Sequence, residues 1–182
     1  MNIRQLGIDD AATYHALRLR MLRIYPDAFT SSYEEDVQKP LSWAQKRLVP
    51  GPDAPDDFVL GAFDEDGRLA GSIGLSVEAR QKQRHKGFVF GMYVAPESAA
   101  QGIGRALLGA CIERAQRIAG LEQLGLTVTA SNLRAVRLYE LAGFKAFGIE
   151  ERAIKVGDEY FAKAHMVLPL SGMQCNARKH RR

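Results

Sequence analysis

The residues with the clearest capacity for chemistry form a glycine-rich turn, Gln101-Gly102-Ile103-Gly104. Alternating apolar residues predict a strand before Pro96, and an apolar stripe after Gly104 predicts a helix to about residue 118. The first N–H groups of a helix lack intrahelical partners and attract anions, and glycine lets a phosphate come close to the backbone. The turn therefore indicates a phosphate site or, alternatively, a purely structural connection.

Two common phosphate-binding patterns do not fit this turn. The dinucleotide-binding pattern needs a small residue where Leu107 stands, and its acidic residue should follow a second strand, whereas Glu122 precedes one. A P-loop needs Gly-Lys-Ser/Thr, which the turn lacks. Metal and disulfide chemistry are also not expected, because Cys111 and Cys175 lie far apart without paired histidines.

Composition and charge exclude several classes of protein. Hydrophobic residues make up 46% and charged residues 25% of the 182 residues, which is typical of a globular chain. The net charge of +4 resides in the segment 173–182, so no basic face for a specific nucleic acid is expected. No apolar run reaches the roughly 18 residues of a membrane helix, and the start of the chain does not resemble a signal peptide. We therefore expect a cytoplasmic protein with one domain over 1–172, a basic tail and no membrane partner.

The remaining elements follow from hydrophobic periodicity and turn residues. A first helix is expected from a cap at Asp9 or Asp10 to the Tyr25-Pro26 step, and a second from a cap at Ser42 to residue 48. A fourth helix is expected from Ser131 or Asn132 to 141. Strands are expected at 3–6, 58–63, 69–77, 88–94, 124–128, 144–149 and 160–168. This order predicts an α+β fold with one parallel crossover around the helix that follows Gly104.

Two segments together resemble motifs of the GNAT N-acetyltransferase family. The segment 93–108 resembles the acyl-CoA-binding motif, Gln/Arg-x-x-Gly-x-Gly/Ala after the fourth strand. The segment 132–144 resembles a later block with an Asn, an Ala, a Tyr and Gly-Phe. The matching positions of the first motif are Val94, Pro96, Glu97, Gln101, Gly102, Gly104, Ala106, Leu107 and Leu108. The resemblance covers roughly 57–168 and implies a central mixed, mostly antiparallel sheet of about seven strands flanked by about four helices.

The resemblance also implies acetyl-CoA as co-substrate. Asn132 would bind the pantetheine arm, and Tyr139 would protonate the departing thiolate as general acid. From the residues alone, Asn132 can instead be a helix cap and Tyr139 a core aromatic residue. The pyrophosphate would be held by backbone N–H groups of Gln101, Gly102, Ile103, Gly104, Arg105 and Ala106. The pantetheine would pair along Met92, Tyr93 and Val94, one of whose N–H groups could stabilise the oxyanion.

The sequence departs from the family pattern in two ways. Ala99 stands where the motif has Arg or Gln, and Phe88 and Phe90 stand where many members carry a strand glutamate that acts as base. Without that glutamate, the candidate bases are Glu34, Glu35 and His85, acting through water. The structural alternatives are a solvated helix start for the two glutamates and an exposed loop for the histidine.

The acceptor is expected to contact the first 50 residues, as in the family generally. Phe29, Tyr33 and Trp43 suggest a partly aromatic pocket, although they can equally be core residues. The function expected is direct acetyl transfer to a primary amine of a small molecule or a peptide, without a metal. The alternatives are transfer of another acyl group, transfer to a hydroxyl, or an acyl-CoA-binding or sensing module with little catalysis. A homodimer is left open.

Overall fold

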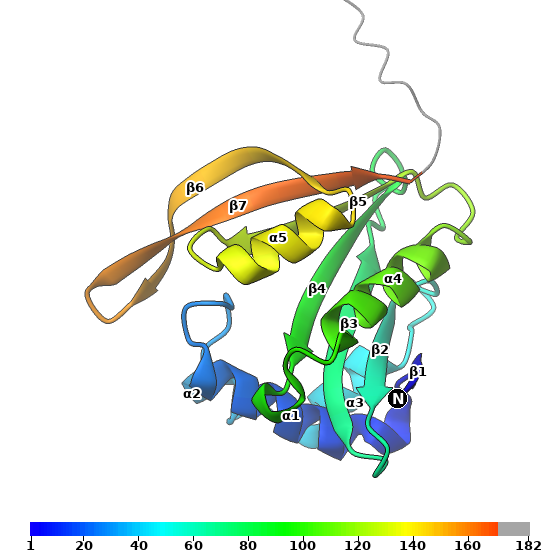
Figure 1. The fold of residues 1–182 in the computed structure, drawn as a ribbon. Helices are drawn as coiled ribbons and strands as arrows, with labels where there is room; N and C mark the ends of the chain where they lie inside the picture. Colours follow the sequence, from blue (N-terminus) through cyan, green and yellow to red (C-terminus); the bar gives the residue numbers. More distant parts are fainter. Residues whose placement is uncertain (171–182) are drawn as a thin grey trace, which may run out of the picture.

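A seven-stranded sheet with the order β1-β2-β3-β4-β5-β7-β6 runs through the computed structural model, which describes residues 1–170 (Figure 1). Neighbouring strands are antiparallel except β4 and β5, which are parallel. The predicted mixed, mostly antiparallel sheet is confirmed, whereas the predicted tail at 173–182 lies outside the described residues. The strands are β1 (Asn2–Gln5), β2 (Phe58–Phe63), β3 (Leu69–Val77), β4 (Lys86–Val94), β5 (Gln123–Thr129), β6 (Lys145–Val156) and β7 (Glu159–Pro169).

Helices cover both faces of the sheet. The segment with α1, α2 and α3 packs on one face, and α4 and α5 pack on the other (Figure 1). The helices are α1 (Ala11–Ile24), α2 (Tyr33–Asp36), α3 (Leu41–Leu48), α4 (Ile103–Ala115) and α5 (Leu133–Leu141), with short 3-10 turns η1 (Ile8–Asp10) and η2 (Pro96–Ser98). The helix beyond the expected four is α2, a single turn that Ser32 caps by accepting a hydrogen bond from the N–H of Glu35.

Three predicted boundaries were wrong. The helix α3 begins at Leu41 after an extended Pro40, so Ser42 is not its cap. The helix α4 ends at Ala115, and Gly120 then takes a left-handed conformation. The strand β6 continues to Val156 because β6 and β7 extend as a two-stranded ribbon, which has a register shift between Glu150 and Ile154. Figure 1 shows this ribbon projecting beyond the helices.

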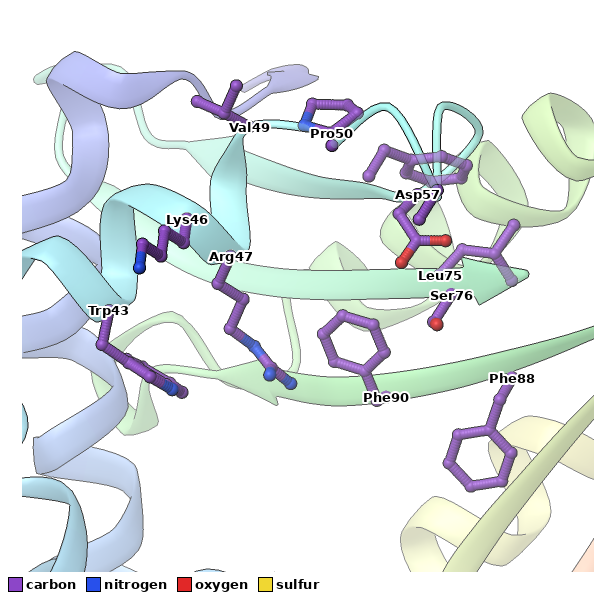
Figure 2. Close-up of a pocket in the computed structure, with 13 residues that line it drawn as sticks. Trp43, Lys46, Arg47, Val49, Pro50, Asp57, Leu75, Ser76, Phe88 and Phe90 are labelled. Atoms are coloured by element: carbon purple, nitrogen blue, oxygen red, sulfur yellow. The ribbon is translucent and has the colours of Figure 1, made fainter. Parts of the chain in front are cut away.

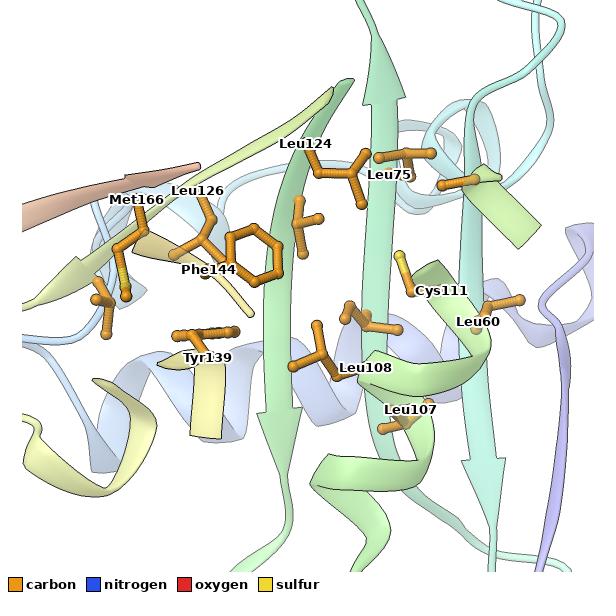
Figure 3. Close-up of a cluster of buried hydrophobic side chains, with 14 of the residues drawn as sticks. Leu60, Leu75, Leu107, Leu108, Cys111, Leu124, Leu126, Tyr139, Phe144 and Met166 are labelled. Atoms are coloured by element: carbon orange, nitrogen blue, oxygen red, sulfur yellow. The ribbon is translucent and has the colours of Figure 1, made fainter. Parts of the chain in front are cut away.

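The larger hydrophobic cluster lies between α4, α5 and the sheet (Figure 3). Leu107, Leu108 and Cys111 of α4 are fully buried there, against Leu124 of β5. Burial raises the pKa of the Cys111 thiol to about 12, so it stays protonated and unreactive near neutral pH. Cys111 is therefore a small residue of the core.

The parallel pair β4 and β5 separates after a short run of hydrogen bonds. Pairing covers only Lys86 to Phe88 of β4, opposite Gln123 to Gly125 of β5. Farther along β4, Gly91 has φ 59°, and the register with β3 shifts between Ser72 and Gly74. A bulge of this kind bends a strand and re-aims it. The two strands therefore diverge and leave a gap that is lined by residues of α1, the segment after α1, α3, α5 and β7.

A buried carboxylate anchors the segment that follows α1. Asp36 is 0% exposed and accepts hydrogen bonds from Arg18 Nε and Lys39 Nζ. Burial opposes ionisation of Asp36, but the bonds from Lys39 and Arg18 outweigh it, so the pKa of Asp36 lies below its ordinary value. The Arg18–Asp36 pair joins α1 to α2 and fixes one wall of the gap.

We expect Asp36→Asn to lower the free energy of unfolding by roughly 3 kcal/mol near neutral pH, because it leaves the buried Arg18 charge uncompensated. The native pKa of Asp36 is depressed, so its stabilisation is present above the unfolded-state value of about 3.9 and declines as pH falls through the native pKa. Urea unfolding at about pH 7 and about pH 3 measures both effects. The control Asp53→Asn lies in an exposed loop and should change stability by less than about 0.5 kcal/mol. An equal deficit of Asp36→Asn at both pH values would contradict this assignment.

Candidate functional site

The glycine-rich turn lies between η2 and the start of α4, as predicted. Gly102 is the N-cap of α4 with φ 76°, a left-handed conformation that glycine adopts at little cost. Ala100 has φ 65°, which is rare for a residue with a Cβ. No side chain among residues 1–170 caps α4, so the N–H groups of its first turn are available to an anion.

A cavity of about 640 Å³ extends from this turn along the second half of β4 to α5. It brings together most of the residues predicted to bind the cofactor, although Gln101 and Ala106 are not among its lining residues. Predicted residues that line it are Met92, Tyr93, Val94, Gly102, Ile103, Gly104, Arg105, Asn132 and Tyr139. Arg134 and Arg137 also line it and are exposed, and sequence reasoning missed both. Three arginines thus line this cavity, and one of them, Arg137, also lies 3.5 Å from Glu140 Oε2.

The second half of β4 has an unpaired edge. Because the ladder with β5 ends at Phe88, the main-chain groups of later β4 residues on that side have no strand partner among the described residues. Gly91, Met92 and Val94 are half-buried and line the cavities at this edge. Main-chain groups in such a position need hydrogen-bond partners, so the edge can receive an extended ligand as an added strand.

A second, inner cavity of about 240 Å³ lies in the gap between β4 and β5. Phe88 and Phe90 of β4, Thr127 and Thr129 of β5, and Tyr139 of α5 line it. The segment after α1 closes it, and Thr129 Oγ1 donates a 2.7 Å hydrogen bond to the carbonyl of Asp27 in that segment. The inner cavity shares Ala28, Phe29, Met92, Asn132, Ala135 and Tyr139 with the larger one. The two cavities therefore meet at Tyr139.

Tyr139 combines a core ring with a position at this junction. It is 6% exposed, and its ring packs edge-to-face on Phe144 at 5.9 Å between centroids (Figure 3). Burial raises the pKa of Tyr139 well above the ordinary tyrosine value, so the hydroxyl keeps its proton at neutral pH. The core position that the sequence left as an alternative therefore coexists with a position beside the ligand cavities.

Asn132 acts as the helix cap that the sequence allowed. Its Oδ1 accepts a 3.1 Å hydrogen bond from the N–H of Ala135 in the first turn of α5. Asn132 also lines both cavities. The cap role and a role at the ligand site are thus compatible in one residue.

None of the three candidate bases lines the two cavities that Tyr139 lines. His85 precedes β4, where its carbonyl accepts hydrogen bonds from Glu122 and Gln123. It lies seven residues from Met92, or about 23 Å along a strand. The carboxylate of Glu35 accepts a hydrogen bond from the N–H of Ser32 and is held in a capping box. Glu34 lines another cavity, of about 630 Å³, beside the β6–β7 turn, and this cavity shares Phe29, Thr30 and Ser31 with the inner one.

The three predicted aromatic residues do not line a single cavity. Phe29 lines both the inner cavity and the cavity that contains Glu34, whereas Tyr33 lines only the latter and stacks on the guanidinium of Arg23. Trp43 lines an outer cavity of about 570 Å³, shown in Figure 2. The outer cavity shares Arg47, Phe88 and Phe90 with the inner one. Phe29 and Trp43 thus lie at the inner and outer cavities, and Tyr33 lines neither of these two.

Three cationic residues that the sequence did not single out line the inner cavity: Arg18, Arg47 and Lys163. They come from α1, α3 and β7, and only the tertiary fold brings them together. Within residues 1–170, no group of three His, Cys, Asp or Glu side chains is arranged to hold a metal ion. Over the same residues, no helix is long and apolar enough to cross a membrane.

Comparison with known proteins agrees with this geometry. A model described as "Acetyltransferase (GNAT) family" matches residues 18–144. The mycothiol acetyltransferase of Clavibacter michiganensis subsp. michiganensis is 33% identical over 146 residues, which cover 78% of this chain and 42% of the relative. The chain spans less than half the length of the curated mycothiol acetyltransferases that it matches.

Solved structures give the same family. The GNAT acetyltransferase from Streptococcus pneumoniae is 27% identical with a TM-score of 0.77, and the match covers 92% of this chain and 98% of that one. YncA of Salmonella typhimurium, solved with its cofactor acetyl-CoA, has a TM-score of 0.76 over 96% of both chains, and at 21% identity it shows the fold alone. The family match at residues 18–144 includes both the glycine-rich turn and Tyr139, and the chain belongs to the GNAT acetyltransferase family.

Proposed function

We propose that this protein transfers the acetyl group of acetyl-CoA to a primary amine within a ternary complex. The observation that carries the proposal is the junction at Tyr139, where a cavity that begins at an anion-binding turn meets a second cavity suited to an acceptor. A direct transfer needs both substrates to meet at one point. The thiol of Cys111 is buried with a raised pKa, so it is no candidate for a covalent intermediate.

The turn would bind the pyrophosphate through backbone donors. The left-handed Gly102 directs the chain into α4, and the first-turn N–H groups together with the helix dipole favour negative charge there. Arg105, Arg134 and Arg137 line the same cavity and add positive charge for phosphate groups. This donor set does not depend on a side chain at position 99, so Ala99 is compatible with binding.

The unpaired edge of β4 would hold the pantetheine arm and position the thioester. The amide and carbonyl groups of the pantetheine arm match the hydrogen-bonding groups of a free strand edge. A β4 N–H group directed at the thioester oxygen would stabilise the negative charge that develops there during attack. Acetyl-CoA supplies an activated acetyl group, and the protein orients it toward the inner cavity.

The chemical step needs one proton donor and one proton acceptor. The amine nitrogen attacks the thioester carbonyl, the carbon–sulfur bond breaks, and the thiolate takes the proton of the Tyr139 hydroxyl, which solvent water then restores. Within the described residues no carboxylate lines the inner cavity, so the proton of the amine passes to solvent water. The same lack of a carboxylate favours the second candidate function, an acyl-CoA-binding module with little catalysis. Turnover of acetyl-CoA with a panel of amines separates the two.

The cofactor site is tested with Gly104→Val. A Cβ at position 104 would lie 3.3 Å from Met92 Cε and 3.6 Å from Leu138 Cδ2, so a branched side chain fills the space between α4, β4 and α5. We expect the dissociation constant for CoA to rise at least roughly tenfold, or about 1.4 kcal/mol. The matched control is Gly109→Val, which lies on α4 with nothing within 4 Å of its Cβ and should leave the affinity unchanged. If calorimetry finds equal affinities for CoA in the two folded variants, CoA does not bind at this turn.

The proton donor is tested with Tyr139→Phe, which keeps the ring on Phe144 and removes only the hydroxyl. We expect turnover to fall by roughly 10²-fold while the affinity for acetyl-CoA stays nearly unchanged. Because burial raises the pKa of Tyr139, the deficit should be constant from about pH 6 to about pH 9. Steady-state kinetics over that pH range measures the loss of turnover. The control is Tyr160→Phe, which removes a hydroxyl from an exposed tyrosine. Full turnover by Tyr139→Phe would show that another group protonates the thiolate.

A further inference from the structure

We propose that the acceptor of this enzyme is a small amine that also carries an anionic group, such as a carboxylate, and that Arg47 and Lys163 bind that group in the inner cavity. The inference rests on the acetyl transfer proposed above and names the class of its substrate. It follows from the charges around the cavity, where Arg18, Arg47 and Lys163 contribute three cations and the described lining residues contribute no carboxylate.

Lys163 is a buried cation without an ion-pair partner among residues 1–170. It is 7% exposed, and its Nζ donates a 3.0 Å hydrogen bond to Thr30 Oγ1, a neutral group. Glu150 is its cross-strand neighbour on β6, but that carboxylate lies 3.2 Å from His165 Nε2. Lysine is rarely buried without a partner, because desolvation disfavours its charge. Burial accordingly lowers the pKa of Lys163, while Glu150 opposes this effect. An anion bound in the cavity would supply the missing countercharge.

Arg47 has the geometry of a carboxylate-binding group. Its Nε donates to the hydroxyl of Tyr14 at 3.2 Å, and its guanidinium carbon lies 4.3 Å from the centroid of the Phe90 ring. No carboxylate forms an ion pair with it among the described residues. Figure 2 shows the side chain reaching from α3 toward Phe90. The bond to Tyr14 uses Nε, which leaves the two terminal nitrogens for an oxyanion.

Arg18 adds to the positive charge, although it has a partner. Asp36 accepts hydrogen bonds from both Arg18 and Lys39, so one carboxylate faces two cations and the group keeps a net charge of about +1. Arg18 Nη2 also donates to Ser31 Oγ at 3.0 Å. Its main role is to hold the wall of the cavity, and its charge strengthens the field that Arg47 and Lys163 create.

The cavities separate the two ends of such a substrate. Tyr139 lies where the inner cavity meets the cofactor cavity, whereas Arg47 lies where the inner cavity meets the outer one. An amine at the first junction would leave the anionic group near the second, with apolar parts against Phe88, Phe90 and Trp43. The inner volume of about 240 Å³ suits a small molecule. A polycationic amine would meet three like charges.

The test compares acceptors that differ only in the anionic group. The L-amino acids and their carboxamides would be assayed with acetyl-CoA, together with spermidine and an alanyl tetrapeptide amide. We expect the best amino acid to exceed its own carboxamide in kcat/KM by at least roughly tenfold, in line with a charge-assisted hydrogen bond. Equal or better rates for the carboxamides, the peptide or spermidine would overturn the inference, while the proposed acetyl transfer would stand.

Variants assign the preference to named side chains. Arg47→Gln should reduce the acid-to-amide ratio of kcat/KM at least roughly tenfold, and Lys163→Gln should reduce it in the same direction. The control is Arg68→Gln, which removes the same charge from an exposed hairpin turn and should leave the ratio unchanged. Thermal unfolding verifies that each variant is folded. A ratio that is unaffected in folded Arg47→Gln and Lys163→Gln would show that these residues do not recognise the anion.

A binding measurement keeps the inference testable even without turnover. Trp43 is the single tryptophan of the chain, and its ring centroid lies 5.3 Å from the Arg47 guanidinium carbon, so its fluorescence reports on this region. The same amino acids and carboxamides would be titrated into CoA-loaded protein. Tighter binding of the acids with no acetylation of any amine would support an anion site at Arg47 and Lys163 and reject the proposed transfer. Failure of the acids to bind more tightly than the carboxamides would reject the inference.

Discussion

The divergence of β4 and β5 is the constraint on which the rest of this structure depends. Two parallel strands side by side would normally satisfy each other's main-chain groups, but here the ladder ends at Phe88. Unpaired main-chain groups inside a protein are costly, so such a gap persists only where a ligand or water can complete the hydrogen bonding. The positive φ of Gly91 and the bulge against β3 direct the second half of β4 away from β5. A binding site thus occupies the point where regular sheet pairing is interrupted.

The elements around the gap each place a different functional group at it. The helix α4 brings its N-terminus to one end, and α5 brings Tyr139 between the two strands. The segment after α1 closes the opposite side, because the Arg18–Asp36 pair and the bond from Thr129 to Asp27 hold it there. The strands of the sheet are rigid, so the groups that meet at the gap are positioned without relying on loops alone. The arrangement separates a cofactor side from an acceptor side at one residue.

Local patterns made much of the fold predictable from the sequence. The strands Phe58–Phe63 and Leu69–Val77 have the predicted bounds because a turn sequence with a left-handed Gly67 lies between two apolar runs. The long β6 was not predictable from its own residues. Most of its residues are exposed, and it remains a strand because β7 pairs with it.

Some residues of the candidate site could be predicted from local sequence motifs, and others could not. Gly102, Asn132 and Tyr139 could be found because each belongs to a short motif whose spacing is local. The cations Arg18, Arg47 and Lys163 could not, since they meet only in the folded protein. The base role of Glu34, Glu35 and His85 stays a prediction, and none of the three lines the inner cavity, because the tertiary fold places them elsewhere. Glu35 completes a helix cap and His85 precedes the paired end of β4.

The hydrogen bonds that hold the acceptor wall join residues that are far apart along the chain. Asp27 is bound to a residue 102 positions later, and Thr30 to one 133 positions later. Contacts of such long sequence separation form slowly, because a large loop must close before they stabilise anything. A ribosome-bound chain that has not yet produced β7 therefore lacks the Thr30–Lys163 bond, even if the glycine-rich turn and α4 have already folded. During synthesis, this part of the acceptor wall can therefore be completed only after β7 has been made.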